Sequence, residues 1–217
     1  MNPGAKSSIS DAPVSSDDLG RILKNPKATA EFRILRATRH LLATVGLGIS
    51  MDAIADEAGI GRSTIFRHFP SRDELVARAL DESLARFHGS VPVTINESAG
   101  LGDWMLATVR SLHTMQLTAG RGIWQLAAAE DDELPEPIAR VNAKRRKDRH
   151  DSTVAIAQEA WKRAGRRGKV PRRVELMFAL VFTSFAAHSL NFDYGADEDE
   201  SVRALAELLT GYLSTEG

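Results

Sequence analysis

Three helix-start signals follow one another within about 22 residues, and this spacing is the strongest constraint on the fold. Ser50 and Ser71 are preferred N-cap residues, and Gly61 takes the same place before the middle start. Glu74 follows Ser71 by three residues, as in a capping box. The first two helices would have only about two turns each, too few for a helix to be stable alone. The sequence therefore predicts short helices that pack on one another between Ser50 and Leu75.

The rest of the chain also has helical periodicity, which predicts an all-α fold. Glycines or a proline separate the periodic segments from about residue 27 onward. Residues 1–24 are rich in Ser, Pro and Asp without periodicity, which is typical of a disordered arm. We expect a helix-turn-helix domain at 25–88 and a C-terminal domain at 89–217, with a connector near 91–100. Longer helices are expected at about 101–118, 121–129, 137–164, 172–192 and 199–213.

The segment from Arg62 to Phe69 divides into two faces at about 100° of rotation per helical residue. Ile65, Phe66 and Phe69 form one apolar face, which we expect to anchor this helix against the neighbouring short helices. The opposite face carries Ser63, Thr64, Arg67 and His68. Such a face is suited to the major groove of DNA, because Arg reads guanine edges or binds phosphates and hydroxyls reach base edges.

Three residues at helix starts are also expected to contact DNA. Arg62 lies in the first turn of the helix at 62–69, where its long side chain can swing clear. Arg72 opposes the macrodipole of the next helix, a mild penalty that a nearby phosphate would offset; a solvated surface arginine is the alternative. Ser50 can bond a phosphate or serve only as a cap. The predicted DNA-binding set is Ser50, Arg62, Ser63, Thr64, Phe66, Arg67, His68 and Arg72.

At these residues the sequence resembles the TetR family of bacterial transcriptional repressors. The resemblance runs from about residue 32 to 80 and consists of ILRATRHLLATVG, SMDAIADEAGIG and RSTIFRHFPSRDELV, in that order. It implies a three-helix DNA-binding head, a fourth helix that links it to a C-terminal domain, and a homodimer on a palindromic operator. It also implies that a small ligand in the C-terminal domain shifts the spacing of the two heads and releases DNA.

Two residues depart from the family pattern. Phe66 stands where the family usually has Tyr, so it lacks the hydroxyl that often bonds a phosphate. Ser63 stands where Gly is frequent, and its side chain can add a base contact or hold the helix slightly off the groove. Both departures concern operator affinity rather than the role of the protein.

The last two expected helices are strongly apolar. The segment 172–192 carries large apolar side chains on nearly every face, so it must be covered on more than one side. The final helix carries Leu205, Leu208, Leu209 and Leu213. The resemblance predicts that these two helices from each subunit form a four-helix dimer interface, and burial within one subunit is the alternative.

Aromatic and polar residues of the C-terminal domain are candidates for an apolar effector pocket. His113 and His188 lie in otherwise apolar segments and could orient a ligand. Plain core packing is the commoner role for any one of these residues. The predicted ligand-binding set is Trp104, His113, Met115, Trp124, Trp161, Phe178, Phe182 and His188.

Charge and composition narrow the remaining possibilities. The net charge is −1, yet residues 130–136 are acidic and the run from Arg140 to Arg149 is basic. This run has cations all round the helix, so a solvated face is the default and a second DNA or partner contact is the alternative. The absence of cysteine excludes disulfides and zinc–thiolate sites. No apolar run reaches the roughly 20 residues of a membrane span, so we expect a cytoplasmic protein.

No cofactor, metal or enzymatic activity is expected, because the sequence has no HExxH, GxSxG or glycine-rich phosphate loop. The leading hypothesis is therefore a homodimeric repressor that a small, largely apolar ligand releases from DNA. Two alternatives remain open at this point: a helix-turn-helix protein without a ligand that acts structurally, and a helical enzyme that kept the head.

Overall fold

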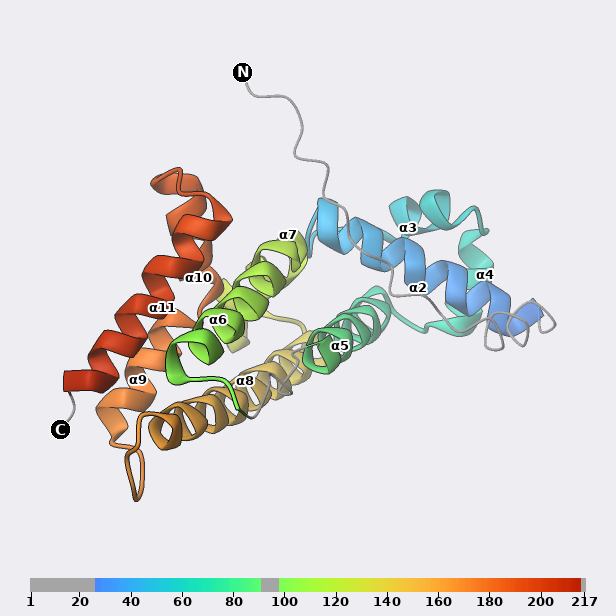
Figure 1. The fold of residues 1–217 in the computed structure, drawn as a ribbon. Helices are drawn as coiled ribbons and strands as arrows, with labels where there is room; N and C mark the ends of the chain where they lie inside the picture. The colour runs from blue at the N-terminus through green and yellow to red at the C-terminus, as the bar shows by residue number, and fades with distance from the viewer. Residues whose placement is uncertain (1–25, 91–97, 216–217) are drawn as a thin grey trace. The chain divides into compact units, whose positions relative to one another are not determined.

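The computed structural model describes the backbone of residues 26–90 and 98–215, and the side chains of residues 29–85 and 98–215. The predicted all-α class is confirmed, and neither described stretch contains a strand (Figure 1). The predicted arm at 1–24 and most of the connector at 91–100 lie outside the described residues. The elements are α2 (Pro26–Thr44), α3 (Met51–Ala58), α4 (Arg62–His68), α5 (Arg72–Ser90), α6 (Leu101–Thr118), α7 (Gly120–Ala128), η1 (Asp131–Glu133), α8 (Glu136–Arg163), α9 (Arg172–Val181), α10 (Ser184–His188), η2 (Ser189–Asp193) and α11 (Glu198–Thr215).

The chain forms two compact units that do not follow the order of the sequence. The head unit combines residues up to Ala85 with the segment 118–142, and the C-terminal unit combines 86–117 with 143–217. The segment 118–142 contains α7 and the start of α8, and it groups with the head although the expected C-terminal domain began at 89. The head is therefore built from more of the chain than its short helices alone.

The head unit is stabilised by helix caps and a small apolar core. The Ser50 hydroxyl accepts a hydrogen bond from the Ala53 amide at 3.1 Å and so caps α3, as predicted. The Ser71 hydroxyl accepts from the Glu74 amide at 3.1 Å, which is one half of the predicted capping box. The core combines side chains from α2 to α5 with two from the later segment: Ile34, Ile54, Ile65, Leu75, Val76, Leu80, Leu126 and Ile138.

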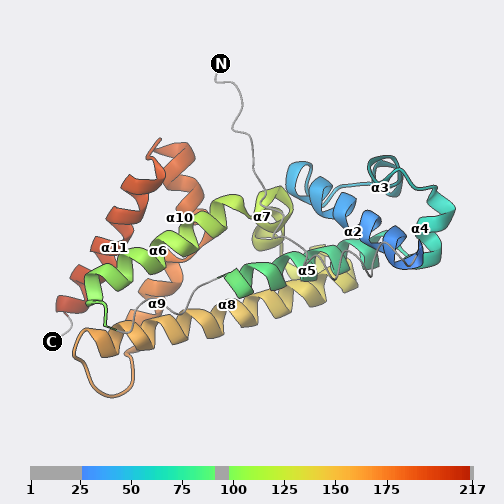
Figure 2. The ribbon, with the colours of Figure 1, turned by 45° about the vertical axis from the view of Figure 1, so that its right-hand side comes forward.

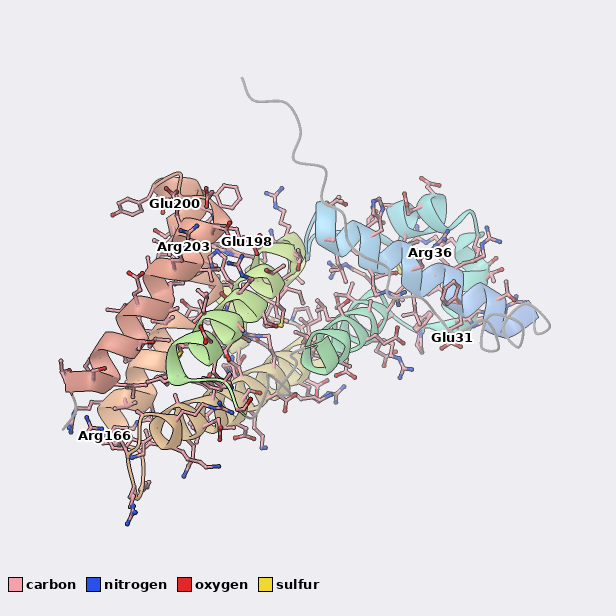
Figure 3. All side chains as sticks on the ribbon, viewed as in Figure 1. Glu31, Arg36, Arg166, Glu198, Glu200 and Arg203 are labelled. Atoms are coloured by element: carbon pink, nitrogen blue, oxygen red, sulfur yellow. The ribbon has the colours of Figure 1, made fainter. Side chains whose placement is uncertain are left out.

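The C-terminal unit has its own apolar core, formed by α6, part of α8, α9 and α11. In both views α9 lies beside α11, and α11 also contacts η2 (Figures 1 and 2). Arg166 lies at the C-terminal end of α11, where its guanidinium reaches the Leu213 and Ser214 carbonyls at 3.5 Å (Figure 3). The largest buried side chains of this core include Trp104, Met105, Phe178, Leu209 and Leu213.

The prediction of one helix over 172–192 is wrong, because the helix breaks at Thr183. The Thr183 hydroxyl donates to the Leu180 carbonyl at 2.9 Å and accepts from the Ala186 amide at 3.0 Å, so it ends α9 and caps α10. Arg149 of the basic run reinforces the break by donating to the Ala179 carbonyl at 2.6 Å. Burial lowers the pKa of the Arg149 guanidinium below its ordinary value.

The break at Thr183 divides the apolar segment 172–192 into two shorter helical pieces. Within 26–90 and 98–215, no single helix is long and apolar enough to cross a membrane. The bent pair Arg172–Val181 and Ser184–Asp193 meets the same test, by length and composition only, with an angle of 44° at the break.

Candidate DNA-binding face and ligand-binding core

The reading helix α4 is held by two of its three predicted anchors. Ile65 is fully buried and Phe69 is 7% exposed, and both belong to the head core. Ser63 and Arg67 are exposed, while Thr64 and His68 are partly buried. No side chain in the described part of the chain pairs with the Arg67 guanidinium. The predicted groove-facing residues thus lie away from the anchored side of α4.

Phe66 departs from its predicted place in the core. Its side chain is 42% exposed, and the Arg62 guanidinium lies over its ring, 5.5 Å from the centroid. The reason is the narrow contact of a seven-residue helix: Phe66 lies about 100° from Ile65 round the helix, beyond the sector that the head covers. The core assignment of Phe66 is wrong, and an exposed aromatic ring stands beside the groove-facing residues.

Arg62 is also engaged within the head. Its guanidinium pairs with the Asp52 carboxylate of α3 at 2.7 Å, and both side chains are more than half exposed. Exposed pairs of this kind contribute about 0–1 kcal/mol to stability, so a phosphate can compete for the guanidinium. The pair joins the first turn of α3 to the first turn of α4.

Arg72 has partners that the sequence did not indicate. Its Nε donates to the Ile49 carbonyl at 2.7 Å, a terminal nitrogen donates to the Leu47 carbonyl, and the other pairs with Asp73 at 2.6 Å. In this structure the guanidinium holds the loop between α2 and α3, and its contact with DNA stays a prediction.

Two further residues position the helix-turn-helix without a signal in the local pattern. Arg33 of α2 donates to the Ala58 and Gly59 carbonyls at 2.7 and 3.2 Å, and so holds the turn between α3 and α4. Gln125 of α7 accepts from the Leu47 amide at 2.7 Å. Both contacts join residues 25 or more positions apart, which no helical wheel can reveal.

Most, but not all, of the predicted ligand-binding residues lie in the C-terminal unit. His188 is half-buried, with its ring 4.3 Å from that of Phe192 on η2. Trp124 lies on α7 in the head unit, so the structure does not group it with the others. Met115 is partly buried against the core. Trp104, Trp161, Phe178 and Phe182 are buried in the core of the C-terminal unit, as plain packing requires.

His113 has a buried ring nitrogen with no hydrogen-bond partner among the described residues. The side chain is 2% exposed, and its Nε2 lies 3.1 Å from the Asn191 amide oxygen. The Asn191 amide nitrogen donates to the Ala196 carbonyl at 2.6 Å, which leaves its oxygen as the acceptor. Nε2 of His113 therefore carries the proton, and Nδ1 is a buried acceptor without a partner among the described residues.

Neighbouring contacts hold His113 in a polar seam between α6 and α11. Arg110 pairs with Asp199 at 2.6 Å, and the Thr114 hydroxyl bonds the Glu198 carboxylate. Figure 3 shows Glu198 at the N-terminal end of α11, where a carboxylate also complements the helix dipole. Burial lowers the pKa of His113, although the bond to Asn191 and the charge of Glu198 oppose the shift.

No group of carboxylates and histidines that could hold a metal ion occurs among the residues the structure describes. Most of the basic run is exposed, with Arg140 paired to Glu136 at 2.7 Å and Lys147 to Asp151 at 2.8 Å. Arg149, by contrast, donates to the backbone carbonyl of Ala179 on α9.

Comparison with known proteins finds a family match within the head. Residues 34–79 match the family model of the bacterial regulatory proteins of the tetR family. The predicted resemblance to the TetR family is confirmed. The fold, an N-terminal helix-turn-helix with a larger helical C-terminal part, is that of a TetR-family DNA-binding transcriptional regulator. No curated protein matches the sequence.

Several solved structures share this fold at low sequence identity. A TetR-type transcriptional regulator from Streptomyces avermitilis is 21% identical, with a TM-score of 0.56, over 86% of this chain and 94% of its own. A regulator from Saccharomonospora viridis in complex with choline is 16% identical, with a TM-score of 0.61 over 87% and 97%. The fatty acid degradation regulator FadR from Bacillus halodurans is 18% identical, with a TM-score of 0.59 over 86% and 95%.

Proposed function

We propose that the protein is a homodimeric, cytoplasmic repressor that binds a palindromic operator and leaves it when a small ligand binds. The observation that carries this proposal is α4, which is anchored by Ile65 and Phe69 and presents Ser63 and Arg67 to solvent. A helix fixed on one side and polar on the other can enter a major groove and read base edges.

The proposed DNA contacts follow from the exposure of each residue. The major groove is read by Ser63, Thr64, Arg67 and His68. The Ser50 hydroxyl donates a hydrogen bond to a phosphate, while its oxygen still accepts from the Ala53 amide and caps α3. Arg62 exchanges Asp52 for a phosphate, and Phe66 packs against the sugar–phosphate backbone. Arg72 has an indirect role in this proposal, because it holds the loop that leads to Ser50.

The proposed dimer interface is an apolar face on the last helices. Phe178, Val181 and Phe182 of the expected interface segment are buried within the subunit. Large apolar side chains from the same helices remain exposed, and a second copy would remove them from water. These are Leu176 at 52%, Leu180 at 65%, Phe185 at 70% and Leu208 at 51% exposed.

The proposed effector is a neutral, largely apolar molecule with one hydrogen-bond donor, bound near His113. The unpartnered Nδ1 accepts such a donor, and burial lowers the pKa of His113 and so favours the uncharged ring. The buried polar side chains described in the C-terminal unit are uncharged: Thr108, His113, Thr153 and Ser201. Choline, bound in the Saccharomonospora viridis regulator, is a cation, and none of the carboxylates described in the C-terminal unit of this protein is buried as a counter-ion would be.

Selection from a random pool of double-stranded DNA tests the proposal. The full chain should enrich a palindrome, and its affinity for that palindrome should fall steeply with salt because bound phosphates release counter-ions. Binding of one protein dimer to each palindrome is expected in sedimentation. Recovery of no common sequence, or enrichment of a site without two-fold symmetry, would overturn the proposal of a homodimer on a palindrome.

A further inference from the structure

Helix α7 approaches α2 closely enough to touch its backbone. Gly122 is buried, and a Cβ atom at this position would lie 2.8 Å from the Leu42 carbonyl oxygen, too close for any side chain. Leu126, one turn further along α7, is fully buried in the head core. The segment that follows α6 is therefore a structural part of the head unit.

The same docking brings the side chain of Gln125 onto the loop between α2 and α3. Its amide oxygen accepts a hydrogen bond from the Leu47 backbone amide at 2.7 Å. Gly46 leaves room for this contact, since a Cβ atom there would lie 2.2 Å from the same oxygen. Gly46 also has a φ of +105°, which few other residues adopt. The loop and Gln125 are thus matched to each other.

Arg72 holds the opposite side of this loop. Its guanidinium bonds the carbonyls of Leu47 and Ile49, while Gln125 bonds the amide of Leu47. Both backbone polar groups of Leu47 are therefore taken by side chains, one from α7 and one from α5. The next residue after the loop is Ser50, the N-cap of α3, so the loop determines where α3 begins.

We propose that Gln125 is a positioning residue for DNA binding: it fixes the α2–α3 loop and, through it, Ser50 and α3. This inference rests on the proposed DNA-binding function. If the Gln125 contact is lost, the segment that shifts would include Asp52 of α3. Asp52 pairs with Arg62 and so links α3 to α4, the reading helix. Gln125 contacts no DNA in this account. It acts by keeping Ser50 and α4 in register with the phosphates and base edges they bind.

Two substitutions in the full chain separate the hydrogen bond from the shape of the side chain. Gln125→Met keeps the length and removes the acceptor, whereas Gln125→Glu keeps an acceptor oxygen. We expect Gln125→Met to weaken binding to the selected palindrome about fivefold to tenfold, the equivalent of one hydrogen bond. Gln125→Glu should bind within about twofold of the original chain, because its carboxylate still accepts from Leu47.

Two further measurements exclude a general loss of structure. The amide of Leu47 should exchange its hydrogen faster in Gln125→Met, while amides in the core of α2 keep their protection. The slope of log affinity against log salt should not change, because no phosphate contact is lost. Equal affinity of Gln125→Met and the original chain overturns the inference, as does an equal loss in Gln125→Glu. Failure of the original chain to select any DNA would instead overturn the proposed function on which the inference rests.

Discussion

The two units of this molecule differ in whether their polar and apolar side chains have partners within the chain. In the head, arginines and serines close the ends of short helices, as Arg33, Ser50 and Arg72 show. In the C-terminal unit, His113 keeps a buried acceptor without a partner, and Leu180 and Phe185 remain exposed. Among the described residues, polar side chains of the head hold its turns and loops, whereas the C-terminal unit has a buried acceptor without a partner and large apolar side chains on its surface. The difference supports the proposal that a ligand and a second subunit bind the C-terminal unit.

The largest expected effect is the difference in stability between replacing a buried and replacing an exposed phenylalanine of the C-terminal unit. Phe178→Ala should lower the free energy of unfolding by about 3–5 kcal/mol, because a fully buried ring leaves a cavity. Phe185→Ala, at a position 70% exposed, should change the unfolding of the monomer by less than about 0.5 kcal/mol. Urea unfolding at low protein concentration measures both. Similar losses in the two variants would break the division between core and surface.

The next effect concerns the exposed apolar face. Leu180→Asp should weaken dimerisation by at least about 100-fold, roughly 3 kcal/mol, because a charge would be buried in the interface. Ala155→Asp, an exposed position on α8, serves as the matched control and should leave dimerisation unchanged. Sedimentation equilibrium gives both constants. A fully dimeric Leu180→Asp variant would show that the second subunit binds elsewhere.

Two arginines test the comparison in the head unit, one with a structural role and one with a proposed DNA-binding role. Arg72→Ala should destabilise the protein by about 1.5–3 kcal/mol, since its partly buried guanidinium bonds two loop carbonyls. Arg67→Ala should leave stability intact and lower the preference for the palindrome with little change in the salt slope of DNA binding, because Arg67 is proposed to read base edges. Thermal unfolding and salt titrations distinguish the two roles. An intact Arg72→Ala protein with a reduced salt slope would restore Arg72 as a phosphate contact.

The smallest effect is a pH dependence that arises from His113. Its pKa lies below the ordinary 6.5 in the folded protein, so below pH 6.5 the unfolded chain binds a proton that the folded protein does not. Stability attributable to His113 should therefore be constant above pH 6.5 and fall below it, by at most about 1.4 kcal/mol per pH unit.

His113→Gln should remove this contribution, and His150→Gln, at an exposed position, should not. Urea unfolding of the three proteins between pH 5 and 8 gives the comparison. Parallel pH profiles for all three would show that His113 is protonated as easily in the folded protein as in the unfolded chain.

The sequence predicted what depends on near neighbours. Caps at Ser50 and Ser71 and the anchor Ile65 follow from spacings of three or four residues, and each was found as expected. The contacts of Arg72 with the α2–α3 loop and of Gln125 with Leu47 join distant segments, so no local pattern contained them. The exposure of Phe66 likewise depends on how wide a sector of α4 the head covers.

The C-terminal unit was less predictable for the same reason. Its all-α class follows from periodicity, but the break at Thr183 depends on Thr183 acting as a cap and on Arg149 reaching α9 from another helix. Burial of Trp104 and exposure of Phe185 could not be told from composition, since both positions are large and aromatic. The lone acceptor of His113 is visible only once Asn191 and Ala196 are placed around it.

The affinity of a Thr64→Ala, Arg67→Ala double variant for the selected palindrome tests the central claim most directly. Both side chains lie on the polar side of α4, outside the head core, so the variant should unfold at the same temperature as the original chain. The account predicts that its preference for the palindrome over random DNA falls by about 100-fold, as expected when base contacts are lost. An unchanged preference in a folded variant would contradict the assignment of α4 as the reading helix.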